Sequence, residues 1–396
     1  MNYIGLQHAF KPGFSTVSNL LETYNIIADH LDKQIPVDVI YLDFQKAFDK
    51  LPHEKLIKKL SSTVPNYIIN WISEFLTGRS QAVIVNGKLS SSLPVSSGVP
   101  QGTILAPLLF ILFTNDIFNL HILSNITAYA DDIKIFGPVS EDHDLSADFE
   151  VVKVWCTENS MSINCGKSGV MHFGKNNPHR PYYLDSTLIP VVTIYKDLGI
   201  IIDKDLSFST HCLALTRKCT RICIMIQKSF SKKRPALLAK LFKLYVLPII
   251  RYSSPFLHPT SCKNINLLEG IQRKFTRFSF PHKSNLDYPC RMATLELDPI
   301  ELHFLKSALI FIFKLLHSDS SIKHILPPLL KSCTRNSSIK FVLPLDNTKL
   351  RKSIFPHNIV SIWNALPAPL LSSSSLSHFR LALNSTDLSS FLRGVL

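Results

Sequence analysis

Short apolar runs rich in β-branched residues alternate with amphipathic stretches over the first 205 residues of the chain. Apolar runs of about four to eight residues predict buried strands, whereas apolar residues spaced three and four apart predict helices. The elements predicted in chain order are a strand over 37–44, helices over 47–60 and 67–76, strands over 81–85 and 89–95, a helix starting at 107, strands over 126–130 and 133–136, a helix over 151–159, and strands over 169–174 and 198–203.

Two of the predicted strand pairs are joined by tight turns. The first pair flanks Asn86-Gly87, a dipeptide typical of a two-residue hairpin turn. The second pair flanks Asp131-Asp132, so this hairpin has two carboxylates at or beside its turn.

The pattern changes after about residue 205. From about residue 209 the chain is helical and basic, and beyond Pro281 apolar helices alternate with breaks rich in Pro and Ser. The sequence therefore predicts an α+β domain followed by a mostly helical remainder.

The positive charge of the chain is concentrated in one segment. Of a net charge of +14, residues 214–280 carry +13, because they contain fourteen Lys and Arg and a single acid, Glu269. Interleaved aromatic residues favour a nucleic-acid-binding track, and a solvated helical face is the alternative. The residues expected to bind nucleic acid are Arg217, Lys218, Arg221, Lys228, Lys232, Lys233 and Arg234.

Composition excludes several other classes of protein. With 46% hydrophobic and 10% aromatic residues, the chain can bury a core and is not disordered. Its longest apolar run, 104–113, is half the length of about 20 residues that a membrane-spanning helix needs. The N-terminus lacks a secretory pattern and the eight cysteines are scattered, so we expect an intracellular protein, nuclear or cytoplasmic, in a reducing compartment.

Most adjacent aspartate pairs lie in exposed turns, so the pair Asp131-Asp132 indicates a metal site only together with other segments. Adjacent carboxylates repel each other, and a divalent cation relieves that repulsion. Mg²⁺ binds one or two carboxylates together with phosphate oxygens. Asp43, at the end of another predicted strand, would complete a site for two ions that activates a hydroxyl and stabilises a leaving phosphate.

Four segments resemble reverse transcriptases of non-LTR, LINE-type retrotransposons. Residues 129–132 (YADD) resemble motif C of reverse transcriptases, and residues 41–53 (YLDFQKAFDKLPH) resemble motif A of the LINE-type elements. Residues 97–110 (SGVPQGTILAPLLF) are similar to motif B, and residues 7–16 (QHAFKPGFST) to a stretch upstream of it. The four occur in the order of the family.

The resemblance continues toward the C-terminus. Residues 164–174 resemble motif D, and residues 195–200 (YKDLGI) resemble the primer-grip region. Three further segments are similar to the region after the polymerase in Jockey-type elements: 251–255, 271–277 and 362–367.

This resemblance implies a fold and a domain order. The fold is α+β, a right-hand polymerase palm (an antiparallel sheet with helices) followed by a mostly helical thumb and C-terminal region. Residues 1–205 correspond to partial fingers and palm, 206–280 to the basic thumb, and 281–396 to a helical region without an assigned role. Finger segments and an endonuclease domain of the family are expected upstream of Gln7, so the sequence resembles a 5′-truncated copy of an element.

The implied activity is RNA-directed DNA polymerisation with two Mg²⁺ ions, or Mn²⁺, on an RNA template, a DNA primer and deoxynucleoside triphosphates, without a membrane partner. Phe48 matches the aromatic gate against the ribose 2′-hydroxyl, which disfavours RNA synthesis. An inactive remnant that only binds nucleic acid is the alternative. The residues implied are Asp43, Asp131 and Asp132 as metal ligands, Lys167 as general acid, and Phe48, Gln101 and Gly102 at the nucleotide.

The sequence departs from the family pattern at a few positions. Ala9 and Ala106 replace glycines, Phe14 replaces an arginine near the phosphates, and Gly166 stands before Lys167 in place of a cysteine. The loss of the arginine charge favours the binding-only alternative.

Overall fold

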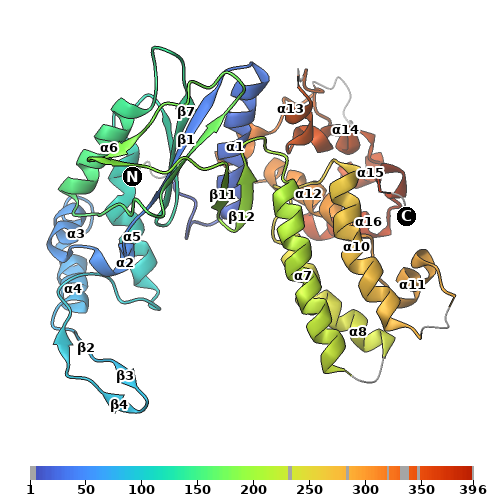
Figure 1. The fold of residues 1–396 in the computed structure, drawn as a ribbon, viewed down its shortest axis with the longest axis horizontal. Coiled ribbons are helices and arrows are strands. Elements are labelled where there is room, and N and C mark those ends of the chain that lie inside the picture. Colours follow the sequence, from blue (N-terminus) through green and yellow to red (C-terminus); the bar gives the residue numbers. More distant parts are fainter. Residues whose placement is uncertain are drawn as a thin grey trace. The chain divides into compact units, whose positions relative to one another are not determined.

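The chain forms two compact units. The computed structural model describes residues 6–230, 234–281, 285–318, 321–330, 339–345 and 348–394. The first unit comprises the residues up to Asn19 together with Gln34–Thr193, and the second comprises Leu20–Lys33 together with the residues from Ile194 onward (Figure 1). Helix α1 (Thr16–Asp32) begins in the first unit and ends in the second.

A four-stranded antiparallel sheet forms the centre of the first unit. Its strands are β1 (Val37–Asp43), β6 (Asn125–Tyr129), β7 (Asp132–Pro138) and β8 (Gly169–Phe173), in the order β6-β7-β1-β8. The first six residues of β1 are buried, so both faces of the sheet are covered at this strand, which explains its apolar sequence. The hairpin predicted around the paired aspartates is confirmed as β6–β7.

Helices and short strands complete the first unit. They are α2 (Ala47–Lys50), α3 (His53–Leu60), α4 (Asn66–Leu76), α5 (Leu105–Thr114), the 3₁₀ turn η1 (Asn115–Asn119), α6 (Ser146–Glu158), and strands β9 (Tyr183–Leu184) and β10 (Thr187–Leu188). The prediction of one helix over 47–60 is wrong, because the chain is extended at Leu51 (φ −60°, ψ 119°). Pro52 disfavours the helical conformation of the residue before it, so α2 ends there and α3 starts anew.

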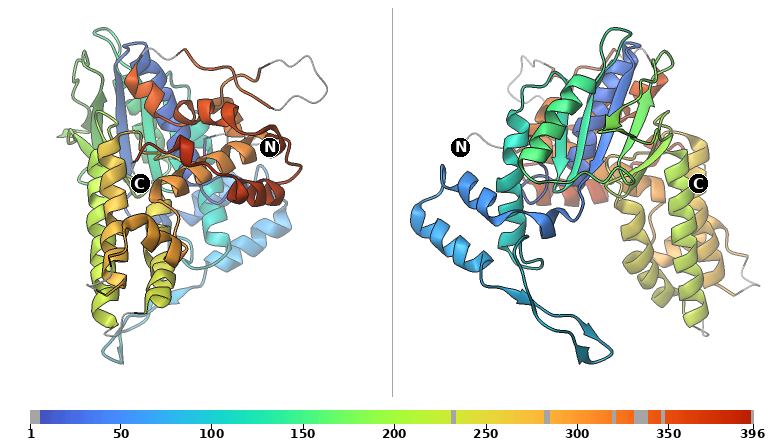
Figure 2. Two further views of the ribbon diagram at one scale, coloured as in Figure 1. Left: turned by 90° about the vertical axis from the view of Figure 1, so that its right-hand side faces the viewer. Right: turned by 60° about the vertical axis from the view of Figure 1, so that its left-hand side comes forward.

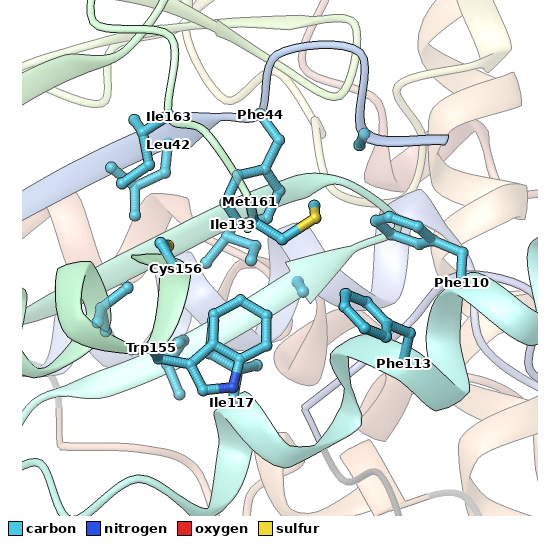
Figure 3. Packing of buried hydrophobic residues seen from close by; sticks show 14 of the residues in the cluster. Leu42, Phe44, Phe110, Phe113, Ile117, Ile133, Trp155, Cys156, Met161 and Ile163 are labelled. Carbon is cyan, nitrogen blue, oxygen red and sulfur yellow. The ribbon is translucent and has the colours of Figure 1, made fainter. Parts of the chain in front are cut away.

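One face of the sheet packs against helices α5 and α6. Figure 3 shows strand residues meeting aromatic and aliphatic residues of these helices in a single buried cluster. The labelled members are Leu42, Phe44, Phe110, Phe113, Ile117, Ile133, Trp155, Cys156, Met161 and Ile163. This packing fixes the sheet on which the end of β1 and the β6–β7 turn are placed.

A buried polar network lies on β1, five residues before its end. The Asp38 side chain is fully buried, and His172 lies directly opposite it on β8. Asp38 accepts hydrogen bonds from His172 Nδ1 (2.7 Å), Asn177 Nδ2 (2.7 Å) and the Tyr182 hydroxyl (2.6 Å). Burial and the Asp38 charge raise the pKa of Tyr182, so its hydroxyl remains a donor.

A hairpin arm projects from the rest of the first unit (Figure 2). Its strands are β2 (Ser80–Gln81) paired with β5 (Leu93–Pro94), and β3 (Ile84–Val85) paired with β4 (Lys88–Leu89). The predicted turn at Asn86-Gly87 is confirmed, since both residues have the positive φ of a type I′ turn (49° and 77°).

The second unit is mostly helical, as the sequence predicts. It begins with the hairpin of β11 (Ile194–Asp197) and β12 (Ile200–Asp203). Its helices after α1 are α7 (Ser209–Ser229), α8 (Pro235–Leu241), the π-helical stretch Phe242–Val246, α9 (Leu247–Arg251), α10 (Cys262–Ser279), α11 (Tyr288–Leu295), α12 (Ile300–Leu316), α13 (Lys349–Ser353), α14 (His357–Ala365), α15 (Ala368–Leu371) and α16 (Leu376–Ser385), with 3₁₀ turns at Ser321–Ile325 and Ser389–Phe391. Among the described residues, no helix has both the length and the apolar character needed to cross a membrane.

Candidate active site

Three aspartates lie at one end of the two inner strands of the central sheet, β1 and β7. Asp43 is the last residue of β1 and lies directly opposite Asp132, the first residue of β7. Directly opposed residues of an antiparallel pair point to the same face of the sheet. Asp131 occupies the turn that precedes β7, and the charge of Asp43 affects its pKa, so the three aspartates that the sequence singles out lie near one another.

The side chain of Gln7 holds the turn before Asp131 in place. Ala130 has a positive φ of 57°, a conformation that costs a non-glycine residue energy. The buried Gln7 amide accepts from the Ala130 N–H (3.0 Å) and donates to the Ala130 carbonyl (3.4 Å). Sequence reasoning assigned Gln7 no role, although it starts the segment 7–16 that resembles the family.

The negative charge of the Asp43 carboxylate is only partly compensated by neighbouring groups. Its Oδ2 atom is buried and has no hydrogen-bond partner among the described residues. The ammonium of Lys167 lies 3.5 Å from that atom and is the positive group paired with it. Burial raises the pKa of Asp131, and the charge of Asp43 raises it further, while Lys167 opposes the shift.

The loop that carries Lys167 is hydrogen-bonded to the end of β1. The Asn164 N–H donates to the Asp43 carbonyl (2.7 Å), and the Ser168 hydroxyl accepts from the Asp43 N–H (3.3 Å). The same hydroxyl donates to the Asn164 carbonyl (2.8 Å). These bonds place Lys167 beside the carboxylates, while its side chain stays 68% exposed.

The segment from Ser97 onward is bonded to the turn around α2. The backbone N–H of Gly98 donates to the Leu51 carbonyl, and the Ser97 hydroxyl donates to the Asp49 carbonyl (2.8 and 3.0 Å). The Gln101 amide donates to the Asp49 carboxylate (2.9 Å), which orients an exposed side chain. A Cβ on Gly98 would lie 2.4 Å from the Asp49 carbonyl oxygen, so only glycine fits there.

Phe48 and Gly102 differ in their surroundings. Phe48 is half-buried and stacks on Phe110, with ring centroids 4.5 Å apart and planes 24° apart. This contact gives Phe48 a packing role in addition to the gate implied by the resemblance. Gly102 is exposed, and no atom lies within 4 Å of where its Cβ would stand, which leaves room at this position.

The basic residues of the second unit follow an exposed side of α7. Arg217, Lys218, Arg221 and Lys228 are on this helix, and Arg234 is exposed just before α8. Lys232 and Lys233 lie outside the described residues. The buried side of α7 carries three cysteines, Cys212, Cys219 and Cys223, whose pKa values are raised by burial. Protonated, buried thiols of this kind are structural.

The acidic edge matches the donors that Mg²⁺ prefers, without forming a complete cage. Within the described parts of the chain, no group of three or more His, Cys, Asp or Glu is arranged to hold a metal ion. The arrangement present is the opposition of Asp43 and Asp132 across the ladder, with an Asp43 oxygen that accepts no hydrogen bond from the described residues. Because Mg²⁺ is commonly bound by one or two carboxylates and completed by substrate phosphates, these residues fit such an ion.

Comparison with known proteins identifies the family. The family described as "Reverse transcriptase (RNA-dependent DNA polymerase)" matches residues 2–208, more than half of the chain. The chain belongs to the reverse transcriptase family. The predicted α+β fold is thereby confirmed, with the antiparallel sheet and helices of the first unit.

The similar proteins of known name come from mobile elements. The probable RNA-directed DNA polymerase from transposon X-element of Drosophila melanogaster is 27% identical over 317 residues, which cover 75% of this chain and 34% of that protein. The RNA-directed DNA polymerase from mobile element jockey of Drosophila funebris is 27% identical over 286 residues, covering 68% of this chain and 31% of that protein. The resemblance to non-LTR retrotransposons is confirmed, and the chain spans about a third of the length of these relatives.

Solved telomerase structures show a more distant similarity. Telomerase from Candida albicans, in complex with a fragment of telomeric RNA, covers 81% of this chain and 54% of its own at 11% identity, with a TM-score of 0.39. Apo telomerase from Candida tropicalis covers 82% of this chain and 53% of its own at 11% identity, with a TM-score of 0.42. The family assignment rests on the sequence match and not on these structures.

Proposed function

We propose that this chain carries the nucleotidyl-transfer site of a retrotransposon RNA-directed DNA polymerase. The observation that carries the proposal is the direct opposition of Asp43 and Asp132 on adjacent strands, with Asp131 in the adjoining turn. The family membership and the relatives named above support it. The substrates are an RNA template, a DNA primer and deoxynucleoside triphosphates.

Asp43, Asp131 and Asp132 would hold two Mg²⁺ ions, or Mn²⁺ in their place. Such ions would supply Lewis-acid activation of a primer 3′-hydroxyl and stabilisation of charge on a departing pyrophosphate. The protein's own contribution is to fix the carboxylates on strands, because positioning and charge stabilisation supply most of the rate in phosphoryl transfer.

Lys167 would act as the general acid. Its ammonium lies 3.5 Å from Asp43 Oδ2, so it is held beside the carboxylates and can donate a proton to the leaving pyrophosphate. Phe48 would exclude nucleotides that carry a 2′-hydroxyl, and its stacking on Phe110 would keep the ring in one orientation. Gln101 and Gly102 would contact the incoming nucleotide.

The second unit would bind the template–primer duplex through α7. Residues 206–280 then act as the thumb, residues 1–205 as partial fingers and palm, and residues 281–396 as a helical C-terminal region. The exposed basic residues of α7 support this role, since cations along one helix side neutralise successive phosphates.

A nucleic-acid-binding protein without polymerase activity is the second candidate. The absence of the family arginine at Phe14, near the expected nucleotide phosphates, favours it. Primer extension on an RNA template with Mg²⁺ separates the two proposals. Extension with deoxynucleotides that is abolished in Asp131→Asn with Asp132→Asn supports the polymerase, whereas tight duplex binding without extension supports the second candidate.

A further inference from the structure

A cavity of about 570 Å³ lies within the second unit between the β11–β12 hairpin, α7 and α9. Its volume falls within the range of small-molecule sites, about 300–1,000 Å³. Its apolar lining comes from all three elements and consists of Ile201, Ala214, Leu215, Pro248 and Ile249. Lys218 also belongs to the basic side of α7 proposed to bind the duplex, and Lys196 and Gly199 lie in residues 195–200, which resemble the primer-grip region. The apolar walls of the cavity have no part in that proposal.

Tyr252 forms a fixed aromatic wall of the cavity. Its hydroxyl donates to the Leu198 carbonyl (3.0 Å). A Cβ on Gly199 would lie 3.1 Å from Cε1 of the ring, so the ring is packed against the hairpin backbone. The residue is nevertheless 50% exposed, which leaves ring surface available to stack on a flat group.

His211 supplies a buried hydrogen-bond donor on the lining. Its Nδ1 atom accepts from the Ile201 N–H (3.1 Å), so the proton of the neutral ring is on Nε2. Burial lowers the pKa of His211 to about 4, which keeps the ring neutral near pH 7. Nε2 is buried and has no hydrogen-bond partner in the described part of the chain, and a buried donor is unfavourable until an acceptor reaches it.

The charged residues that line the cavity are all positive. Lys196 of β11 and Lys218 of α7 both border it, and none of the described residues that line it is Asp or Glu. Both lysines are exposed, so their ammonium groups remain hydrated without a ligand. The cavity therefore combines apolar walls with an edge that attracts an anion.

We infer that this cavity binds a small aromatic acid. The ring system would stack on Tyr252 against the apolar lining, the acidic group would face Lys196 and Lys218, and one acceptor atom would receive the Nε2–H of His211. A nucleotide fits less well, because a base brings several donors and acceptors to a wall with few free polar groups. The Ser253 hydroxyl, for example, already donates to the Ile250 carbonyl (3.3 Å).

Isothermal titration of the full chain with 2-naphthoate tests the inference. We expect saturable binding, at least tenfold weaker binding of the neutral 2-naphthol, and at least tenfold weaker naphthoate binding in Lys196→Gln with Lys218→Gln. Lys204→Gln with Lys314→Gln removes the same charge from two exposed lysines that do not line the cavity, and this matched control should leave binding unchanged.

A second variant fills the cavity without removing a buried group. Ala214→Trp, at a partly exposed position of α7, should abolish naphthoate binding while thermal melting shows that the unit remains folded. Naphthoate binding that survives this change, or no binding at millimolar concentration, would overturn the inference. Tighter binding of deoxyadenosine monophosphate than of naphthoate would overturn the assigned ligand class.

Discussion

Asp43 and Asp132 are directly opposed across the β1–β7 ladder, one at the last position of its strand and the other at the first. Their carboxylates therefore point to the same face of the sheet. A site built on paired strands is held more rigidly than a site built on loops, as the proposed nucleotidyl transfer would require.

The first prediction concerns these carboxylates. Asp131→Asn with Asp132→Asn should reduce primer extension by about 100-fold or more, the size of effect seen when a group that stabilises transition-state charge is removed. Duplex binding should stay the same or become slightly tighter, because two charges that repel phosphate are removed. Primer extension and equilibrium titration measure the two effects. The control is Glu141→Gln with Asp142→Asn, an exposed pair with the same change of charge. An equal reduction of extension in the control would contradict the assignment.

The second prediction concerns nucleotide selection by Phe48. Phe48→Val should raise the ratio of ribonucleotide to deoxynucleotide incorporation by about tenfold or more, since a site that rejects by steric exclusion no longer does so when space opens. It should also lower the melting temperature, because the ring no longer stacks on Phe110. Phe113→Leu, at a buried residue of the same hydrophobic cluster, is the control, and it should lower stability without changing the ratio. A lower melting temperature with an unchanged ratio would mean that Phe48 serves only the core.

The third prediction compares two glycines of the same segment. Gly98→Ala should destabilise the first unit by about 3 kcal/mol or more, because the left-handed conformation and the clash with the Asp49 carbonyl both oppose a Cβ. Gly102→Ala should cost only about 1–2 kcal/mol, since its φ is also positive but the surrounding space is empty. Hydrogen exchange over residues 46–53 and 97–101 should rise strongly in the first variant alone. Equal protection in both variants would show that the close approach of Gly98 to Asp49 does not hold the segment.

The fourth prediction concerns the salt dependence of duplex binding. Arg217→Gln with Arg221→Gln on α7 should weaken template–primer binding and reduce its log–log salt slope by about 0.9 for each phosphate that the protein no longer neutralises. Lys352→Gln with Arg380→Gln removes the same charge from α13 and α16. An equal change in slope for the two pairs would indicate an effect of net charge and not a binding surface.

The fifth prediction concerns pH and the second unit. Burial lowers the pKa of His211 to about 4, and that of His258 and His303 to about 3. Between these values and about 6.5, the unfolded chain takes up protons that the folded chain does not. The free energy of unfolding is therefore highest above about pH 6.5 and falls progressively as the pH drops toward 4. The uptake of a proton by His211 in the unfolded chain accounts for about 3 kcal/mol of this loss.

Urea unfolding of the second unit at pH 7 and at pH 4.5 measures this effect. His211→Gln should reduce the difference in unfolding free energy between the two pH values. His378→Gln, at an exposed position of α16, is the control and should preserve the difference. A difference unaffected by His211→Gln would show that other groups cause the acid sensitivity.

Local patterns predicted the elements of the first unit well where a single strand or turn carried the signal. The strand over 37–44 and the turn at Asp131-Asp132 were found because strand propensity and hairpin chemistry act over a few residues. The break at Leu51 is not visible in the apolar spacing, which continues across Pro52, because it comes from the effect of Pro52 on the conformation of the residue before it.

Long-range contacts account for most of what the sequence could not reveal. The bonds from Gln7 to Ala130 join residues that are far apart in the chain, and no local pattern specifies them. The same holds for the cavity around His211, which exists only because a hairpin and two helices pack together. The triad itself was predicted through family resemblance, since a pair of aspartates alone is common in exposed turns.

The hydrogen bonds of Asp38, near the start of β1, help to set the position of Asp43 at the other end of the strand. Asp38 and Asp43 are an odd number of positions apart, so they point to opposite faces of the sheet. A slip of β1 by one residue would move each side chain to the other face of the sheet. Asp38 would then lose its hydrogen bonds from His172, Asn177 and Tyr182. Asp43 would no longer lie opposite Asp132. The buried network thus fixes the register of β1, and substitutions at Asp38 should impair the nucleotidyl transfer proposed at Asp43, although Asp38 contacts no substrate.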